Sequence, residues 1–349
     1  MGYQKRVLNS IKFRTRYFLF NKVGLPSTSF SSLLFEKSIS WIDRYLSDKH
    51  GVSLSISIKP LAEGEQYRNK YFAIVLHGKV YDEDFLIKNI QHMRSMCPES
   101  LLILSTYFDG MTPRLERTCE VENVNISLLD EPAQLPPPYA ANFARGVASA
   151  YNGLVMAQSL GATRVMKLRV DQEITRSQGL KFAEKLLSGE ILSGIGAGRI
   201  VGTSYNSYKK PPLFLSDMLQ IGNIEDLLRY WAPFEPRNFE DLTDSIFSNA
   251  DEVLSHWKAV PEVWLAARYV HSLGLEVGAA VNTNLQFWSN YAAVIDATTL
   301  GQNWLKSINC LDSNYASIKW FEESFDNQYL EMHFSDWALL ALDSRNHER

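Results

Sequence analysis

Asp171 and Glu173, two acids separated by one position, follow a short apolar stretch and form a pair that can hold a metal ion. Hard oxygen ligands of this kind favour Mg²⁺ or Mn²⁺ over zinc. A cation held there can bridge a diphosphate and neutralise charge on a leaving group. Such pairs are common on protein surfaces, so their meaning depends on the elements around them.

The residues before this pair predict a β-strand with one charged face. Side chains alternate along a strand, so Lys167, Arg169 and Asp171 face one way, and Glu173 joins them if the chain stays extended. Two cations and two anions on one face of a central strand are costly to bury unless they are paired or bind a ligand. The pattern indicates a polar cleft in which the cations assist as fixed positive charges. An edge strand with a salt-bridged, solvent-facing side is the alternative.

Strands and helices alternate in the middle of the chain. The predicted strands are residues 71–76, 101–105, 124–129 and 165–170, and the predicted helices include residues 86–97 and 142–160. This alternation is typical of an α/β fold with a mainly parallel central sheet and flanking helices. In such sheets ligands bind outside the carboxyl ends of the strands.

Every predicted strand ends in polar or turn-forming residues. These strand exits are His77–Gly78, Thr106–Gly110, Asp130 and Asp171–Glu173. Because the carboxyl ends of parallel strands share one edge of the sheet, the four exits predict a common site.

Composition limits the classes of protein that fit. The 349 residues allow one large domain or two ordinary ones, and the net charge of −4 gives no reason to expect a nucleic-acid partner. Three distant cysteines match neither a disulfide framework nor a zinc site, which fits a cytoplasmic location. The sequence contains no membrane-spanning apolar run, no signal peptide, and none of the Walker, G-x-S-x-G or H-E-x-x-H motifs.

The first 22 residues combine basic and aromatic side chains, and the first acidic residue is Glu36. This composition fits a peripheral anchor on the anionic inner face of the cytoplasmic membrane, and also a solvated basic helix or an arm packed on the body. We expect an N-terminal helical extension at residues 1–69, a main domain at 70–310, and a C-terminal extension at 311–349 that packs on it.

The stretch from Asn142 to Glu173 resembles the WavE family of lipopolysaccharide-synthesis proteins. The matching features are an Asn-x-x-Arg helix start at Asn142 and Arg145, an Asn-Gly-Leu at residues 152–154, and KLRVD at residues 167–171, where the family reads close to KLRSD. Scattered similarities extend over roughly residues 70–275. The resemblance implies a glycosyltransferase with a nucleotide-diphospho-sugar (GT-A) fold. It would act on a lipopolysaccharide or another surface polysaccharide, that is, on a glycan or glycolipid acceptor.

The resemblance also implies a metal site. In GT-A folds the acidic motif after the fourth strand holds the metal and the donor diphosphate, which carries over to Asp171 and Glu173. The second acid varies in the family, and Val170 stands where Ser is usual. Such enzymes often add a late histidine to the metal, and His333 is the candidate here.

Transfer of a sugar needs a base for the acceptor hydroxyl, and Asp217 and Glu262 are the candidates. Each has a structural alternative. Asp217 fits a helix N-cap, and Glu262 follows a proline and fits a favourable charge at a helix N-terminus.

The other strand exits receive donor-binding roles. We expect His77, Gly78 and Asp109 to contact the nucleoside, Asp130 to bind its base or ribose hydroxyls, and Arg145 to lie where a helix N-terminus favours phosphate. Ordinary turn chemistry and a surface arginine are the alternatives.

Two other functions remain open at this point. A sugar nucleotidyltransferase normally has a Gly-rich loop after its first strand, for which His77–Gly78–Lys79 is too short. A non-catalytic polysaccharide-assembly or binding protein would keep the fold without the chemistry, against which the presence of both Asp171 and Glu173 argues mildly.

Overall fold

The computed structural model describes residues 66–132, 142–189, 200–209, 211–305 and 332–345. The chain divides into two compact units, Met1–Leu54 and Ser55–Arg349, and all described residues belong to the second. The basic residues 1–22, almost all of the expected N-terminal extension and residues 311–331 of the expected C-terminal extension lie outside the described residues.

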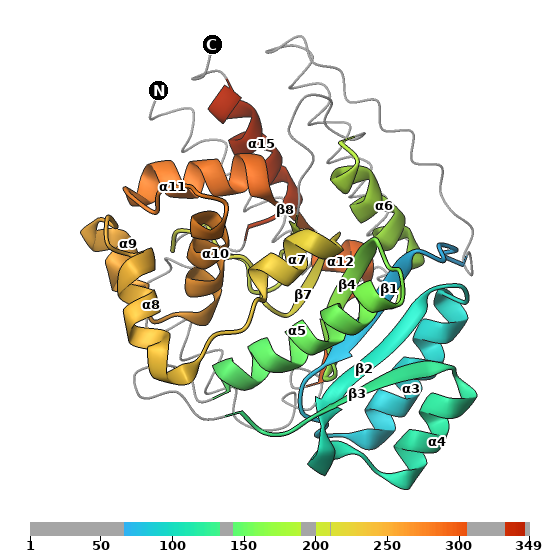
Figure 1. Ribbon diagram of the computed structural model, residues 1–349. Coiled ribbons are helices and arrows are strands. Elements are labelled where there is room, and N and C mark those ends of the chain that lie inside the picture. The colour runs from blue at the N-terminus through green and yellow to red at the C-terminus, as the bar shows by residue number, and fades with distance from the viewer. Residues whose placement is uncertain (1–65, 133–141, 190–199, 210, 306–331, 346–349) are drawn as a thin grey trace, which may run out of the picture. The chain divides into compact units, whose positions relative to one another are not determined.

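A seven-stranded sheet with the order β3-β2-β1-β4-β7-β6-β8 forms the centre of the unit (Figure 1). Its strands are β1 (Phe72–His77), β2 (Leu101–Tyr107), β3 (Val124–Leu129), β4 (Arg164–Arg169), β6 (Ile200–Thr203), β7 (Leu219–Asn223) and β8 (Ala292–Ile295). All pairs are parallel except those of β7, which runs against both β4 and β6. The prediction of a mainly parallel sheet with flanking helices is confirmed.

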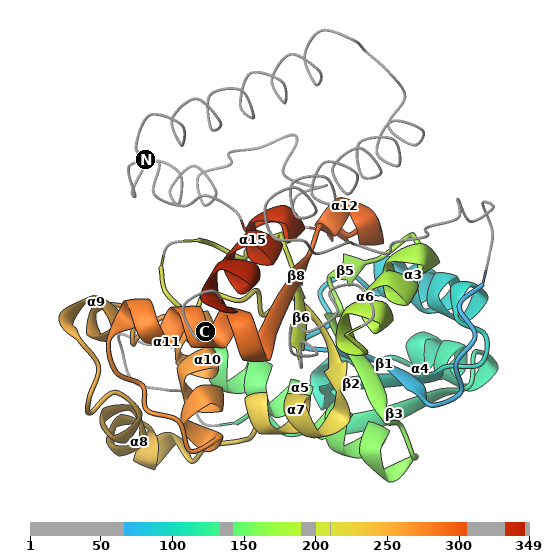
Figure 2. The same cartoon turned by 90° about the horizontal axis from the view of Figure 1, so that it is seen from above.

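Helices cover both faces of this sheet. On one face lie α5 (Phe143–Ser159) and α7 (Ile224–Tyr230), and on the other α3 (Glu83–Met96) and α6 (Ser177–Leu187) (Figure 2). The remaining elements are α4 (Pro113–Val121), α8 (Phe239–Ile246), α9 (Glu252–His256), α10 (Pro261–Ser272), α11 (Ala280–Gln286), α12 (Ala297–Leu300), α15 (Phe334–Arg345), and a two-stranded ladder of β5 (Gln172–Glu173) with β9 (Asn303–Trp304).

The strand order creates a switch point between β1 and β4. From β1 the chain moves outward through β2 to β3, and then returns over α5 to place β4 on the other side of β1. Open α/β sheets bind ligands in the crevice at such a point, outside the carboxyl ends of the strands. His77 and Arg169 are register partners at these two strand ends.

The antiparallel strand β7 contributes a further segment to the same edge. Because β7 runs against β4, its first residue, Leu219, pairs with Leu168 near the carboxyl end of β4. The preceding residues, Ser216–Met218, therefore enter the sheet at the edge where the parallel strands end. Neither β7 nor α4 is among the elements predicted from the sequence, although the Thr112 cap and Pro113 at the first helical position of α4 are recognisable start signals.

Close packing of α5 on the sheet depends on a glycine. A Cβ atom on Gly153 would lie 3.0 Å from Ser105 Cβ and closer still to Val75 Cγ1, so the helix approaches β1 and β2 as nearly as the backbone allows. Gly146, two turns earlier on the same helix, has open space where a Cβ would lie.

We expect Gly153→Ala to reduce the free energy of unfolding by about 1–3 kcal/mol, because the added methyl group must displace buried side chains. Gly146→Ala is the matched control and should leave stability equal or raise it by up to about 1 kcal/mol, as alanine favours the helix. Urea unfolding of both variants measures this. Equal effects of the two substitutions would contradict the packing.

Candidate active site

The charged face of β4 is buried at the centre of the molecule. Lys167 has no exposed surface, Asp171 is 4% exposed, and Arg169 between them is half-buried. β4 is flanked by β1 and β7, so the edge-strand alternative is wrong. The buried charges predicted from the alternating pattern are present for Lys167, Arg169 and Asp171, and each has partners. The strand ends at Arg169 and the chain turns at residues 170–171, so the extended geometry that would bring Glu173 onto the same face does not persist.

Arg169 and Asp171 neutralise each other. The guanidinium donates from Nε and from its second terminal nitrogen to the two carboxylate oxygens at 3.0 and 2.9 Å, a bidentate pair. Trp304 on β9 donates its indole N–H to Asp171 Oδ2 at 3.0 Å, and its ring lies 6.0 Å from the guanidinium carbon. The pairing of Gln172 with Trp304 brings this distant tryptophan to the site.

The predicted metal ligands are not gathered into one cluster. Glu173 accepts a hydrogen bond from Asn303 at 2.9 Å, and His333 pairs instead with Asp296, at 2.7 Å, beyond the end of β8. Within the described ranges no three His, Cys, Asp or Glu side chains lie close enough together to hold a metal ion. The carboxylate of Asp171 accepts three hydrogen bonds in this arrangement, two from Arg169 and one from Trp304.

Lys167 binds a backbone carbonyl. Its Nζ donates to the oxygen of Asp217, and the ring of Trp231 lies 4.0 Å away, within the range of a cation–π contact. Burial lowers the pKa of Lys167 to about 7, opposed by the negative charges of Asp217 and Asp171.

Asp217 and Glu262 both influence this lysine, and each other, electrostatically. Asp217 precedes β7, and Glu262 lies in the first turn of α10, where Asn206 donates to its Oε1 at 3.0 Å. Burial raises the pKa of Glu262 to about 8, and the neighbouring charge of Asp217 adds to the rise. The two candidate bases, from segments 45 positions apart, are therefore near enough for the charge of one to shift the pKa of the other.

His77, the last residue of β1, is held in its neutral form. Its Nδ1 lies 3.0 Å from Ser149 Oγ, and that hydroxyl donates to the carbonyl of Arg145, so we assign the proton to Nδ1. Burial, together with the positive charges of Lys167 and Arg169, lowers the pKa of His77 well below its usual range. Nε2 has no hydrogen-bond partner among the described residues. His77 is buried at the base of the site, 3% exposed.

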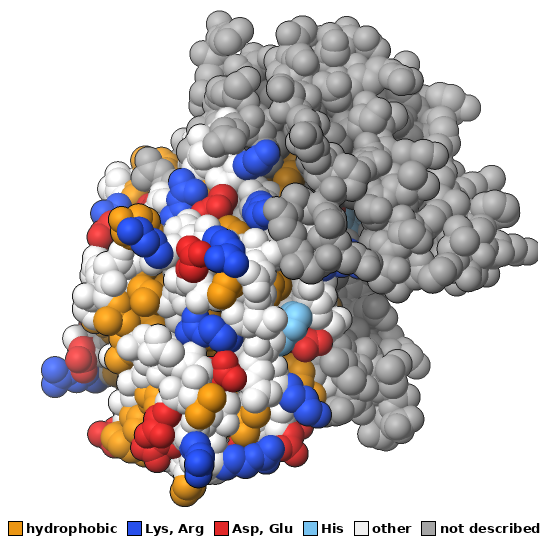
Figure 3. Space-filling view, turned by 90° about the vertical axis from the view of Figure 1, so that its right-hand side faces the viewer, with side chains coloured by type: hydrophobic (Ala, Val, Ile, Leu, Met, Phe, Trp, Pro, Cys, Tyr) orange, Lys and Arg blue, Asp and Glu red, His pale blue; other side chains and the backbone are white. Residues whose placement is uncertain are grey.

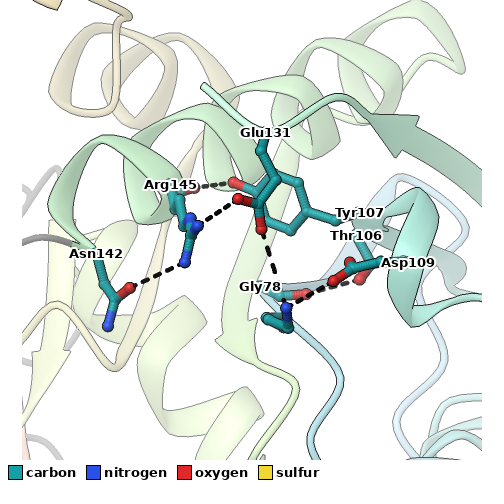
Figure 4. Close-up of polar contacts among 8 residues, drawn as sticks. Gly78, Thr106, Tyr107, Asp109, Glu131, Asn142 and Arg145 are labelled. Carbon is teal, nitrogen blue, oxygen red and sulfur yellow. Dashed lines mark hydrogen bonds and ion pairs between the residues drawn. The ribbon is translucent and has the colours of Figure 1, made fainter. Parts of the chain in front are cut away.

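Ion pairs link the exits of β1, β2 and β3 (Figure 4). Lys79 pairs with Asp109 at 2.6 Å and with Glu131 at 3.9 Å, and Arg145 pairs with Glu131. We call these four residues the exit network. The exit network lies at the strand ends where we expect contacts with the nucleoside.

Two other predicted donor residues lie at these exits. Gly78 turns the chain after β1 with a φ of 114°, a conformation that favours glycine, and its carbonyl accepts from Thr106 at 2.8 Å. Asp130 is exposed immediately after β3.

Trp231, Gln220, Trp304 and Asn206 were missed by the sequence analysis. Trp231 directly follows α7, where a tryptophan is also ordinary core. Gln220 lies on the strand that was not predicted. Trp304 and Asn206 reach the site only through long-range pairing, for which the sequence carries no local signal.

One face of the described surface carries charges of both signs. Figure 3 shows acidic and basic side chains interspersed over the described part of one face. No helix among the described residues has the length and apolar character to cross a bilayer.

No protein-family model matches this chain, and no curated protein matches it in sequence. Among solved structures it is similar to the "crystal structure of a glycosyltransferase involved in the glycosylation of the major capsid of PBCV-1". The identity is 10%, the TM-score 0.28, and the match covers 65% of this chain and 82% of that chain. Similarity at this level does not establish a shared fold, and the resemblance to the WavE family stays a prediction.

We expect Glu262→Gln to flatten the pH dependence of stability. Glu262 keeps its proton in the folded chain up to about pH 8 but loses it near 4.5 when unfolded, so the free energy of unfolding falls as pH rises between these values. Gln carries no titrating group and removes this fall. Lys167, with a pKa lowered to about 7, acts in the opposite direction above that pH.

The measurement is urea unfolding at a series of pH values below 7, where Lys167 does not interfere. Glu240→Gln, an exposed glutamate on α8, is the control and should keep the wild-type slope. Identical slopes in wild type and Glu262→Gln would contradict the raised pKa.

Proposed function

We propose that the chain is a glycosyltransferase that moves a sugar from a nucleoside-diphosphate donor to a hydroxyl group of a glycan or glycolipid. The observation that carries this proposal is the meeting of two kinds of groups at the switch point between β1 and β4. One is a bidentate Arg169–Asp171 pair, and the other is the acidic pair of Asp217 and Glu262 with its raised pKa.

The first kind of group suits the donor diphosphate. Arg169 is a planar, permanently charged donor that recognises phosphate oxygens in the same bidentate way as a carboxylate. In the proposed reaction the diphosphate takes the place of Asp171 on part of the guanidinium. The positive charge then stabilises the leaving group as the bond to the sugar breaks.

The second kind of group suits the acceptor. A base that removes a hydroxyl proton works best with a pKa near the working pH, and that of Glu262 is about 8. Two interacting carboxylates divide the roles, because the charge on one favours the proton on the other. We propose Glu262 as the base, with Asp217 beside it to orient the acceptor hydroxyl.

A divalent cation remains part of the proposal. Mg²⁺ is commonly held by one or two carboxylates plus substrate phosphates. The half-buried Glu173 would supply one of them, and Asp171 would supply a second once the diphosphate has taken its place on part of the Arg169 guanidinium. When bound, Mg²⁺ or Mn²⁺ would neutralise charge on the diphosphate. We leave His333 out of the proposed cation site, because its Nδ1 pairs with Asp296 at 2.7 Å.

The class of acceptor rests on the WavE resemblance alone, which suggests lipopolysaccharide or another surface polysaccharide. A cytoplasmic location, with peripheral membrane contact through residues 1–22, is proposed on the same basis and on the basic composition of that segment.

Binding of nucleoside diphosphates tests the proposed function. We expect one of UDP, GDP, CDP and ADP to raise the melting temperature in the presence of Mn²⁺, since a ligand at 100 times its Kd stabilises by about 2.7 kcal/mol. No response to any of them would contradict the proposal. A response only to a nucleoside triphosphate with a sugar 1-phosphate would identify a nucleotidyltransferase instead.

Glu173→Gln should weaken the Mn²⁺-dependent part of nucleoside-diphosphate binding by at least about tenfold, because a neutral amide is a poor ligand for a hard cation. Calorimetry with and without Mn²⁺ separates this part from binding without metal. Asp244→Asn, an exposed carboxylate on α8, serves as the control. Unchanged metal dependence in Glu173→Gln would remove Glu173 from the cation site.

Asp171→Asn should lower turnover of the donor by on the order of 100-fold while the chain stays folded, because the guanidinium of Arg169 loses the carboxylate that aims it. Donor turnover is measured as release of nucleoside diphosphate, and folding by circular dichroism. Turnover equal to that of wild type would exclude Asp171 from the site.

A further inference from the structure

Lys167 is a buried cation that the proposed reaction does not use directly. It has no exposed surface, and moving an ammonium group out of water costs several kcal/mol unless its partners compensate. Its Nζ contacts are the carbonyl oxygen of Asp217 and the face of Trp231, neither of which is a substrate position. A buried lysine that binds a backbone carbonyl points to a role in holding that backbone.

Gln220 holds the preceding carbonyl in the same way. It is the register partner of Lys167 across β4 and β7, and its Nε2 donates to the oxygen of Ser216 at 3.0 Å. Trp231 joins the two side chains, because its indole N–H donates to Gln220 Oε1 at 2.7 Å while its ring lies over Lys167. Two consecutive carbonyls before β7 are thus fixed by neighbouring side chains on one face of the sheet.

Two other backbone groups of this segment have partners outside it. The N–H of Ser216 donates to Ser207 Oγ at 2.9 Å, and the carbonyl of Met218 accepts from the N–H of Arg169 at 3.3 Å. The segment Ser216–Met218 is therefore held from β4, from β7 and from the loop after β6. Asp217 at its centre projects the carboxylate that raises the pKa of Glu262.

We infer that Lys167 is a positioning residue that fixes the backbone at Asp217, so that the Asp217 carboxylate stays beside Glu262, and that it does not contact the donor phosphates. The catalytic role of Asp217 and Glu262 rests on the proposed function. The role of Lys167 in fixing the backbone at Asp217 does not depend on it. This assignment differs from the donor-binding role that the sequence suggests for Lys167. Arg169, two residues later on the same face, is the phosphate-binding cation.

The surrounding charges agree with this role. Lys167 is faced by His77 from β1, by Arg169 and Asp171 from β4 and its exit, by Asp217 before β7, and by Glu262 from α10. His77 is neutral and Glu262 keeps its proton up to about pH 8, so the charged neighbours of the lysine are Asp171, Asp217 and Arg169. The two carboxylates oppose the effect of burial on Lys167 without a ligand phosphate.

Lys167→Met tests the inference. Methionine matches the length of the side chain and suits an apolar site, and replacing a buried ion with an apolar group of similar volume is often neutral for folding. We expect faster amide hydrogen exchange in residues 216–219 and donor turnover lower by on the order of 100-fold, as for a misplaced catalytic group. Affinity for the nucleoside diphosphate identified above should stay within about twofold.

Two further variants calibrate the result. Arg169→Met should lose at least about tenfold in nucleoside-diphosphate affinity, because a charge-assisted hydrogen bond to phosphate is removed. Lys88→Met changes an exposed lysine on α3 and should leave exchange, affinity and turnover unchanged. If Lys167→Met does not fold, Gln220→Leu provides a second route, since it frees the neighbouring carbonyl and should also speed exchange in residues 216–219.

The outcomes separate the inference from the proposed function. A tenfold loss of nucleoside-diphosphate affinity in Lys167→Met, with exchange unchanged, would make Lys167 a phosphate ligand and overturn the inference. If no nucleoside diphosphate binds the wild-type chain, the proposed function fails. The exchange measurement then decides alone: faster exchange in residues 216–219 supports the positioning role, and unchanged exchange overturns it.

Discussion

The burial of an amine at the middle of a seven-stranded sheet is the constraint on which the site depends. Lys167 can stay there only because a carbonyl, an aromatic face and nearby carboxylates balance its charge, and because His77 beside it is kept neutral. Each of these partners comes from a different element. The requirement to balance one charge therefore ties β1, β4, β7 and α7 into a single arrangement.

Arg169 and Asp171 form a second charged group at the carboxyl end of β4, and in this group the two charges neutralise each other. Their mutual pairing leaves little net charge at the strand exit when no ligand is bound. An incoming anion must displace the Asp171 carboxylate from the Arg169 guanidinium. This requirement favours ligands that present two oxygens to the guanidinium at once. The chemistry of the donor and that of the acceptor thus lie on adjacent but separate groups, with the lysine beneath both.

Part of this arrangement follows from the sequence alone. The alternation of apolar and charged residues along β4 predicts the buried charged face, because strand geometry has a period of two residues. β7 carries no comparable pattern: its five residues include Gln220 and a glycine, and its role depends on partners more than 50 positions away. Trp304 illustrates the same limit, since only the ladder between β5 and β9 brings it to Asp171.

The direction of β7 has a consequence for how such a protein can change. Its entry segment, Ser216–Met218, is held by hydrogen bonds from β4, from β7 and from the loop after β6, so the segment that carries Asp217 tolerates little insertion or deletion. The exits of β1, β2 and β3 are instead linked to one another by partly exposed ion pairs such as Lys79–Asp109. Such pairs can be replaced at little cost in stability. Substitutions that change ligand preference would accumulate at these exits, while the segment around Asp217 would stay constant and preserve the reaction.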